Sequence, residues 1–226
     1  MWKRFLSSSE NFYDSKVGLI FQSLFMNFML RPYYKLFFKM EVQGKENIPR
    51  DNRLIFASSH ASYHDPPLLA AATRMHMAYM AKKELFEVPV LSQLISGLGA
   101  FPVNRQKLEI KTIKTAKRIL SSKRWNLGIF PQGTRIMDGT LGEVKAGFGH
   151  LAKVTKSPVI PVYIDLKRGK YPFYGKIVVK IGKQLPHSDN VDEIQENWKK
   201  ALSELSGKDF TKAETTDGKE SATVLL

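Results

Sequence analysis

Cysteine is absent from this chain of 226 residues, and long apolar stretches are scarce. Without cysteine there are no disulfides, no thiolate nucleophile and no thiolate metal site, and such a composition suits a reducing compartment. The apolar stretch Val17–Leu30 is shorter than the ~20 residues that a membrane-spanning helix requires. The start Met1–Leu6 is basic, but polar residues at Ser7–Asn11 interrupt the apolar core of a signal peptide, so we expect no secretion signal.

Acidic residues are also in short supply: 35 lysines and arginines stand against 21 aspartates and glutamates, for a net charge of +14. A basic surface attracts polyanions, which leaves nucleic acid, anionic lipid headgroups, a phosphorylated cofactor or an acidic carrier protein as candidate partners. The aromatic residues concentrate near the N-terminus and do not alternate with basic ones, and this pattern argues against nucleic acid. Hydrophobic residues make up 43% of the chain, which is enough for a folded core.

Residues 1–40 contain two short apolar runs. The run Val17–Leu30 ends at Pro32, and a second run, Tyr33–Met40, carries Lys35 and Lys39 four positions apart, on one side of a helix. This pattern predicts a two-helix hairpin that lies in the interface of a bilayer. The alternative is a pair of helices that pack into the protein core.

The rest of the chain alternates between patterns typical of strands and of helices. Strands are predicted at Arg53–Ser59, Asn126–Phe130, Val159–Ile164 and Lys176–Ile181, and helices at Leu68–Met80, Lys107–Ser122, Lys145–Thr155 and Val191–Leu205. This order predicts an α/β fold, a mostly parallel central sheet flanked by helices, in one domain over residues 41–206. Residues 207–226 are polar, and we expect a flexible tail there.

The predicted helix Lys107–Ser122 has a basic stripe along one side. Lys107, Lys111, Lys114 and Arg118 are spaced by four, three and four residues, so they share a face. Two interpretations remain open: a solvated helix face or a docking surface for phosphates.

A histidine and an aspartate stand five positions apart where the first predicted strand ends. The stretch His60–Asp65 comes directly before Pro66 and Pro67, which favour the first turn of a helix. An aspartate that accepts one ring N–H leaves the other nitrogen as a base. The alternatives are a surface histidine beside a capping aspartate, and a metal site formed by His60, His64 and Asp65.

Two later segments combine glycine with arginine. Gly97–Arg105 ends in Arg105, which could bind a phosphate as a bidentate fork, although a helix end followed by an edge strand fits as well. Phe130–Arg135 follows a predicted strand, with Gly133 suited to a turn. Taken alone, this second segment is an ordinary turn.

Together, these segments resemble the glycerolipid acyltransferase family, and specifically the 1-acylglycerol-3-phosphate acyltransferases of the bacterial type. The family pattern is His-X4-Asp, a Gly-Phe-Arg block, Phe-Pro-Glu-Gly-Thr-Arg, and a proline within an apolar strand. The matching segments are His60–Asp65, Gly99–Arg105, Phe130–Arg135 and Val159–Val162. The resemblance covers about residues 40–185, and the apolar N-terminus is similar to the family's membrane-binding helix pair.

The resemblance implies a mechanism. His60 deprotonates the free hydroxyl of the acceptor while Asp65 holds the imidazole, and the alkoxide attacks the thioester of acyl-CoA or of an acyl carrier protein. Neither a cofactor nor a metal is implied, and the protein is expected at the cytoplasmic face of the cell membrane, bound to its anionic surface. The substrate-binding residues implied in this way are Gly99, Phe101, Arg105, Gln132, Gly133, Thr134, Arg135, Lys145 and Pro161.

The sequence departs from the family pattern at two positions. Gln132 replaces the usual glutamate, and Ser59 stands where asparagine often precedes the histidine. In the family the glutamate belongs to the acceptor site, so the glutamine leaves the identity of the acceptor open. A different lysophospholipid or a lipid alcohol is one alternative, and a non-catalytic lipid-binding protein of the same fold is another.

Overall fold

The computed structural model describes residues 12–50, 53–104, 109–136, 140–168 and 175–211. Its centre is a seven-stranded sheet in the order β1-β7-β6-β2-β5-β3-β4. All neighbouring strands pair in parallel except β6 and β7, which are antiparallel, so the sheet is mixed. The strands are β1 Glu41–Gln43, β2 Ile55–Ser58, β3 Met77–Lys82, β4 Ala100–Val103, β5 Asn126–Ile129, β6 Val159–Arg168 and β7 Gly175–Ile181.

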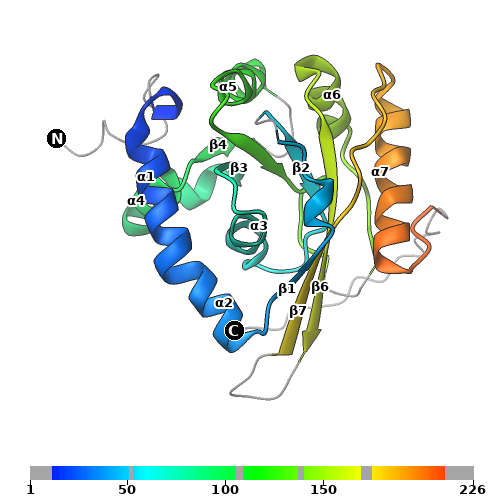
Figure 1. Ribbon diagram of the computed structural model, residues 1–226. Coiled ribbons are helices and arrows are strands. Elements are labelled where there is room, and N and C mark those ends of the chain that lie inside the picture. The colour runs from blue at the N-terminus through cyan, green and yellow to red at the C-terminus, as the bar shows by residue number, and fades with distance from the viewer. Residues whose placement is uncertain (1–11, 51–52, 105–108, 137–139, 169–174, 212–226) are drawn as a thin grey trace.

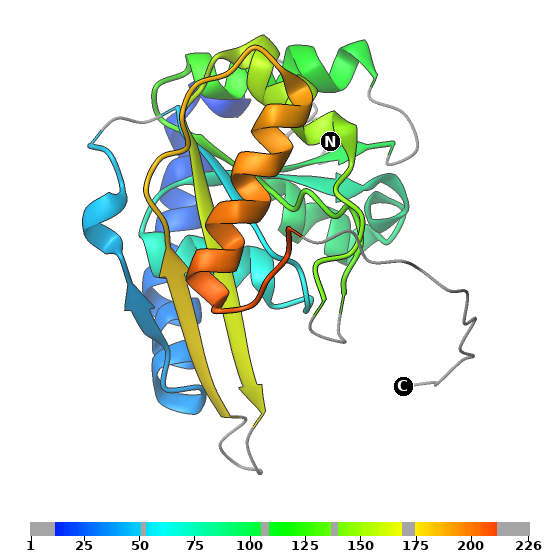
Figure 2. The same ribbon diagram turned by 90° about the vertical axis from the view of Figure 1, so that its right-hand side faces the viewer.

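Helices cover both faces of this sheet (Figure 1). They are α1 Lys16–Phe25, α2 Arg31–Phe37, α3 Asp65–Thr73, α4 Pro89–Gly97, α5 Ile110–Ser121, α6 Ala146–Thr155 and α7 Val191–Ser206. Figure 2 shows α7 lying across one face beside α6, and Figure 1 shows α5 on the other side of α6. Alternate residues of β2 divide between two cores: Ile55 and Ala57 pack on the side of these three helices, whereas Phe56 packs on the side of α2 and α3.

The N-terminal segment is one helical run and not the predicted hairpin. Helices α1 and α2 join through a π-helical turn, Met26–Leu30, and the backbone stays right-handed helical at both junctions. Proline normally breaks a helix because its ring meets the carbonyl four residues earlier. Here Pro32 lies in the first turn of α2, directly after the wider π-helical turn, in which Arg31 N–H bonds Met26 O.

This helical run belongs to the folded core. The Gln22 amide donates to the backbone oxygens of Met77 and Leu98, and its oxygen accepts from Met77 N–H. Met26 and Tyr34 are buried against α3 and the sheet. The boundary predicted near residue 40 is therefore not a boundary between separate packing units. Among the described residues, no helix has the length and apolar character needed to cross a membrane.

The predicted helix Leu68–Met80 was wrong in its second half. Helix α3 ends at Thr73, Arg74 adopts a left-handed conformation with φ +61°, and the chain then enters β3. A short apolar run such as Met77–Ala81 fits a buried strand and a buried helix equally well by its pattern. The strand β3 was missed for this reason, and β1 is too short, at three residues, to leave a pattern. The alternative of a helix end followed by an edge strand at Gly97–Arg105 agrees with α4 and β4.

The carboxyl ends of β2, β3, β4 and β5 meet at one edge of the sheet, because these strands run parallel. The His60 loop follows β2, and the turn at Phe130–Gly133 follows β5. In open α/β sheets such an edge is the usual position of a binding site.

Candidate active site

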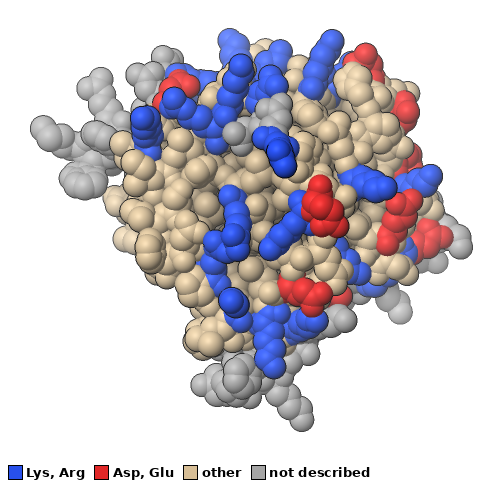
Figure 3. Space-filling model, viewed as in Figure 1, with Lys and Arg blue, Asp and Glu red and all other residues tan. Residues whose placement is uncertain are grey.

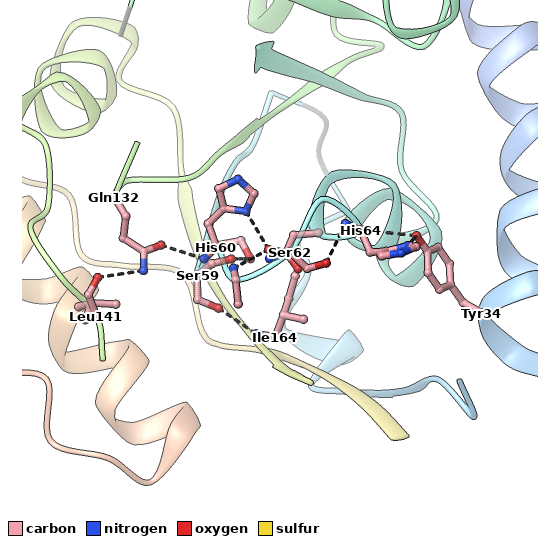
Figure 4. A network of polar contacts seen from close by, with 11 residues as sticks. Tyr34, Ser59, His60, Ser62, His64, Gln132, Leu141 and Ile164 are labelled. Atoms are coloured by element: carbon pink, nitrogen blue, oxygen red, sulfur yellow. Dashed lines mark hydrogen bonds and ion pairs between the residues drawn. The ribbon is translucent and has the colours of Figure 1, made fainter. Parts of the chain in front are cut away.

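The loop after β2 is held rigidly where it leaves the sheet (Figure 4). Ser59 N–H donates to Val162 O, and the Ser59 hydroxyl accepts from Ile164 N–H at 3.0 Å. Both partners belong to β6, the neighbouring strand. Ser59, which stands where the family often has asparagine, therefore anchors the residue that precedes His60.

His60 and Asp65 form a buried pair. His60 Nδ1 lies 2.7 Å from Asp65 Oδ2, and the same oxygen accepts the backbone N–H groups of Ala61 and Ser62, each at 2.7 Å. Asp65 is fully buried at the first turn of α3, where the helix dipole favours a negative charge. A carboxylate at this nitrogen fixes the tautomer with the proton on Nδ1. Nε2 is then the ring nitrogen that can accept a proton.

Gln132 is buried beside this pair, with 3% of its surface exposed. Its oxygen accepts from His60 N–H at 2.8 Å, and its amide donates to Leu141 O at 2.9 Å. Figure 4 shows the side chain lying between these two backbone groups. Both polar ends of the Gln132 side chain are therefore bonded to backbone groups of the protein, and contact with the acceptor stays a prediction.

A pocket of about 450 Å³ opens at His60, a volume typical of small-molecule sites. The imidazole stacks on Phe130, with the ring centroids 4.2 Å apart. Phe130 in turn stacks on Tyr79, whose hydroxyl donates to Pro66 O at 2.6 Å. Burial raises the pKa of Tyr79 well above its ordinary value, so this hydroxyl keeps its proton. The apolar residues that line the pocket are Met80, Val103, Ile129, Phe130, Pro131, Ala146, Phe148 and Leu151.

A lysine lies at this pocket, and an arginine lies on the turn that borders it. Gly133 and Lys145 line it, and the Gly133 φ of +69° permits the turn that brings the segment close. Arg135 is exposed, and its guanidinium lies 3.4 Å from the centre of the Tyr63 ring. Thr134 is exposed on the same turn. Three of the predicted binding residues therefore share one turn after β5, and Lys145 joins them from the start of α6.

Three other predicted binding residues have structural roles away from the pocket. Gly99 adopts φ +87°, and a Cβ there would approach the Trp125 ring to 2.6 Å. Phe101 is buried in the core between the sheet and α5. Pro161 lies within β6, against Gly182. Arg105 lies outside the described residues, although Val103 and Asn104 just before it line the pocket.

The structure does not bring His64 together with His60 and Asp65, the other two residues of the alternative metal site. His64 Nδ1 lies 3.1 Å from the Tyr34 hydroxyl, and Figure 4 shows its ring directed away from His60. No group of three potential metal ligands exists among the residues that the structure describes. The turn Ser62–His64 separates the two imidazoles before α3 begins.

Sequence reasoning missed several contributors to the site. Tyr63 contacts Arg135, Leu141 supplies a backbone acceptor, and Phe148 and Leu151 on α6 form part of the pocket wall. For Tyr63, the sequence offered one signal, an aromatic residue inside the His-X4-Asp stretch. A backbone carbonyl leaves no trace in a sequence.

The chain matches a protein-family model described as Acyltransferase over residues 39–165. This span is more than half of the chain and contains the His60–Asp65 pair. A protein of Bacillus subtilis named 1-acyl-sn-glycerol-3-phosphate acyltransferase is 33% identical over 153 residues, which cover 66% of this chain and 75% of that one. A Limnanthes alba protein of the same name is 33% identical over 127 residues, 55% of this chain and 44% of its own length.

A solved structure supports the same relationship. The crystal structure of the 1-acyl-sn-glycerophosphate acyltransferase PlsC from Thermotoga maritima superposes with a TM-score of 0.63 at 27% identity. The alignment covers 84% of this chain and 80% of the other. The fold, the family match and the paired histidine and aspartate within the matched span agree, and the chain belongs to the acyltransferase family.

Proposed function

We propose that this protein transfers an acyl group from a thioester to the free sn-2 hydroxyl of 1-acylglycerol-3-phosphate, which gives phosphatidic acid for phospholipid synthesis. The observation that carries the proposal is the buried His60–Asp65 pair at an apolar pocket. With Nδ1 held by Asp65, Nε2 can act as a general base. The names of the Bacillus and Thermotoga relatives support the same reaction.

The reaction balances with one histidine. His60 Nε2 takes the proton of the acceptor hydroxyl, and the resulting alkoxide forms a C–O bond to the thioester carbonyl. When the tetrahedral intermediate collapses, the C–S bond breaks and the imidazolium returns its proton to the thiolate. Asp65 stabilises the imidazolium in between, and no covalent enzyme intermediate, cofactor or metal is required.

The pocket suggests how the two substrates are divided. Its apolar wall suits a fatty acyl chain, which gains free energy from leaving water. Arg135 and Lys145, together with Arg105, offer cations to the acceptor phosphate. The donor is a thioester of coenzyme A or of an acyl carrier protein, and both are anionic partners for a chain of net charge +14.

We place the protein on an anionic membrane at its cytoplasmic face, where both thioester donors occur. The outer side of α1 and α2 exposes large apolar side chains, an unusual surface for a soluble protein. Figure 3 shows this side as a broad area almost free of charge, with lysines and arginines along its border. Basic residues beside an apolar surface favour anionic headgroups. The exposed apolar residues are Val17, Ile20, Phe21, Leu24, Phe28, Met29, Tyr33, Leu36 and Phe37.

The direct test is turnover by the purified protein, with 1-acylglycerol-3-phosphate in mixed vesicles and labelled acyl-CoA or acyl carrier protein. We expect labelled phosphatidic acid, and we expect His60→Ala to lower kcat by about 100-fold or more, the usual share of a general base. Circular dichroism and thermal unfolding serve to show that the variant is folded. Wild-type protein without product from either donor, or equal turnover by folded His60→Ala, would overturn the proposal. A parallel panel of other lysophospholipids and lipid alcohols identifies the preferred acceptor.

A further inference from the structure

Both backbone polar groups of His60 are held by the segment after β5. His60 N–H donates to the Gln132 side-chain oxygen at 2.8 Å, and His60 O accepts from Ile136 N–H at 2.8 Å. The imidazole ring meets this segment through its stacking on Phe130. The main chain of the base is therefore positioned from the 130–136 segment, while Asp65 orients its ring.

Gln132 also ties this segment to a more distant part of the chain. Its amide donates to Leu141 O, nine residues further along the chain. Directly after Gln132 come Gly133, which lines the pocket, and Arg135, which contacts the Tyr63 ring. One side chain thus connects the base to the turn that presents the cationic side chain.

We propose that Gln132 is a positioning residue that holds His60 and the Arg135 turn in register, and that this position requires an amide. The inference rests on the proposed function, because Gln132 acts through His60. An amide has one acceptor end and one donor end, and the partners here are one N–H donor and one C=O acceptor. They leave a single orientation of the side chain, and both bonds lie in a buried environment where each is costly to lose.

An ionised glutamate cannot replace this amide. Its oxygens accept hydrogen bonds only, so one oxygen would face the Leu141 carbonyl without a proton between them. A protonated glutamic acid could donate to that carbonyl and restore both bonds. The natural glutamine therefore makes the geometry at His60 independent of the protonation of residue 132.

The surroundings favour the protonated acid in such a variant. Burial raises the pKa of a carboxyl group because it disfavours the charged form. The titratable groups nearby are His60 and Asp65 on the loop after β2, and Arg135, Glu143 and Lys145 between β5 and α6. The two cations have other contacts, Arg135 with Tyr63 and Lys145 with Glu143.

The experiment compares Gln132→Glu with the wild type across pH 5.5 to 9. We expect the ratio of kcat for the variant to kcat for the wild type to fall by about tenfold or more from the acidic to the alkaline end, since small displacements of a base are expensive. Gln132→Met, which loses both bonds and has no charge, should be slow at every pH. KM for the acceptor should change less than kcat in both variants.

A matched control and a second readout keep the test decisive. Gln195 also donates its amide to a backbone oxygen, that of Val144, but it lies on α7 and not on the catalytic loop. Gln195→Glu should leave the shape of the pH profile unchanged. Thermal unfolding gives a measure without activity: a buried carboxyl of raised pKa stabilises the fold below its unfolded pKa and loses that contribution as pH rises through its folded pKa. The Tm of Gln132→Glu, relative to wild type, should therefore fall as pH rises.

The outcomes separate the two proposals. A wild type without acyl transfer refutes the proposed function, and the thermal readout then tests the position of Gln132 by itself. An active wild type with a pH-independent ratio of kcat for Gln132→Glu refutes the positioning role. A change confined to acceptor KM would also refute it, because that result assigns the residue to the acceptor site.

Discussion

The loop around His60 and the helical run from Lys16 to Phe37 distribute polar and apolar groups in opposite ways. In the loop, charged and polar side chains are buried and bonded, with Asp65 accepting three donors through one oxygen. On the helical run, large apolar side chains point outward and a polar one, Gln22, points inward. The first arrangement fixes a geometry in the absence of water. The second leaves a surface whose stable partner is a medium less polar than water.

The largest effect should come from neutralising the acid of the loop. Asp65→Asn can keep an oxygen toward Ala61 and Ser62, but it loses the charge that stabilises the imidazolium. We expect kcat to fall by about 100-fold or more, with a folded protein. The measurement is steady-state turnover beside thermal unfolding. A loss of less than threefold would show that the buried charge has no part in proton transfer.

On the inner side of the helical run, as in the loop, the loss of a buried hydrogen-bonding side chain should be costly. Gln22→Met removes three hydrogen bonds and leaves Met77 N–H and the oxygens of Met77 and Leu98 without this partner. We expect the free energy of unfolding in urea to fall by about 2–3 kcal/mol, since buried polar groups without partners are costly. Gln184→Met, at an exposed glutamine, is the control. An equal decrease in the free energy of unfolding in both variants would show that the hydrogen bonds of Gln22 contribute nothing specific to stability.

On the outer side of the helical run, a substitution should leave stability unchanged and alter binding to vesicles. Phe28 is 77% exposed, so Phe28→Glu is expected to leave folding unchanged. Partitioning to vesicles with anionic lipid should fall by about tenfold, because an apolar contact is lost and a repelled charge is added. Val154→Glu, at an exposed apolar position on α6, provides the comparison. Equal partitioning of Phe28→Glu and wild type, measured by vesicle sedimentation, would remove the membrane role of this surface.

The smallest effect concerns a histidine under α1. His76 Nε2 lies 2.7 Å from the Ser23 hydroxyl, and burial lowers the pKa of His76 although a hydrogen bond with the Leu19 backbone opposes the shift. The unfolded chain then binds this proton more readily, so the contribution of His76 is present above pH 6.5, its approximate unfolded value, and is lost as pH falls below it. Urea unfolding of wild type and His76→Gln at pH 5 and 7.5 checks this. The same difference in the free energy of unfolding between wild type and His76→Gln at both pH values would contradict this prediction.

The sequence was informative where chemistry depends on local spacing. His60 and Asp65 are five residues apart on one loop, so their pairing required only that β2 end before His60 and α3 begin near Pro66. The alternation of patterns likewise predicted most strands and helices on the carboxyl-terminal side of α5.

The remaining features depend on contacts between distant residues. The partners of Gln132 include a backbone oxygen, and the Cβ clearance at Gly99 depends on Trp125, so no local pattern distinguishes a positioning or packing role from substrate binding. The apolar wall of the pocket joins β3, β4, β5 and α6, whose sequences are typical of any core. Apolar residues exposed at a surface and apolar residues packed in a core also produce similar runs, and the helical run has exposed apolar residues on one side and buried ones on the other.

The π-helical turn at Met26–Leu30 has a consequence for the phase of the helix. Gly18 and Tyr34 both face the protein, yet with 3.6 residues per turn they would lie about 160° apart around an unbroken α-helix. The wider π-helical turn takes up one extra residue, so the angle between Gly18 and Tyr34 around the helix axis becomes much smaller. Helix α2 therefore keeps the orientation that it would have in a regular α-helix one residue shorter. A chain with one residue fewer between Met26 and Leu30 would therefore present the same two sides as a regular α-helix. The length of this segment and the orientation of Tyr34 toward His64 are thus coupled.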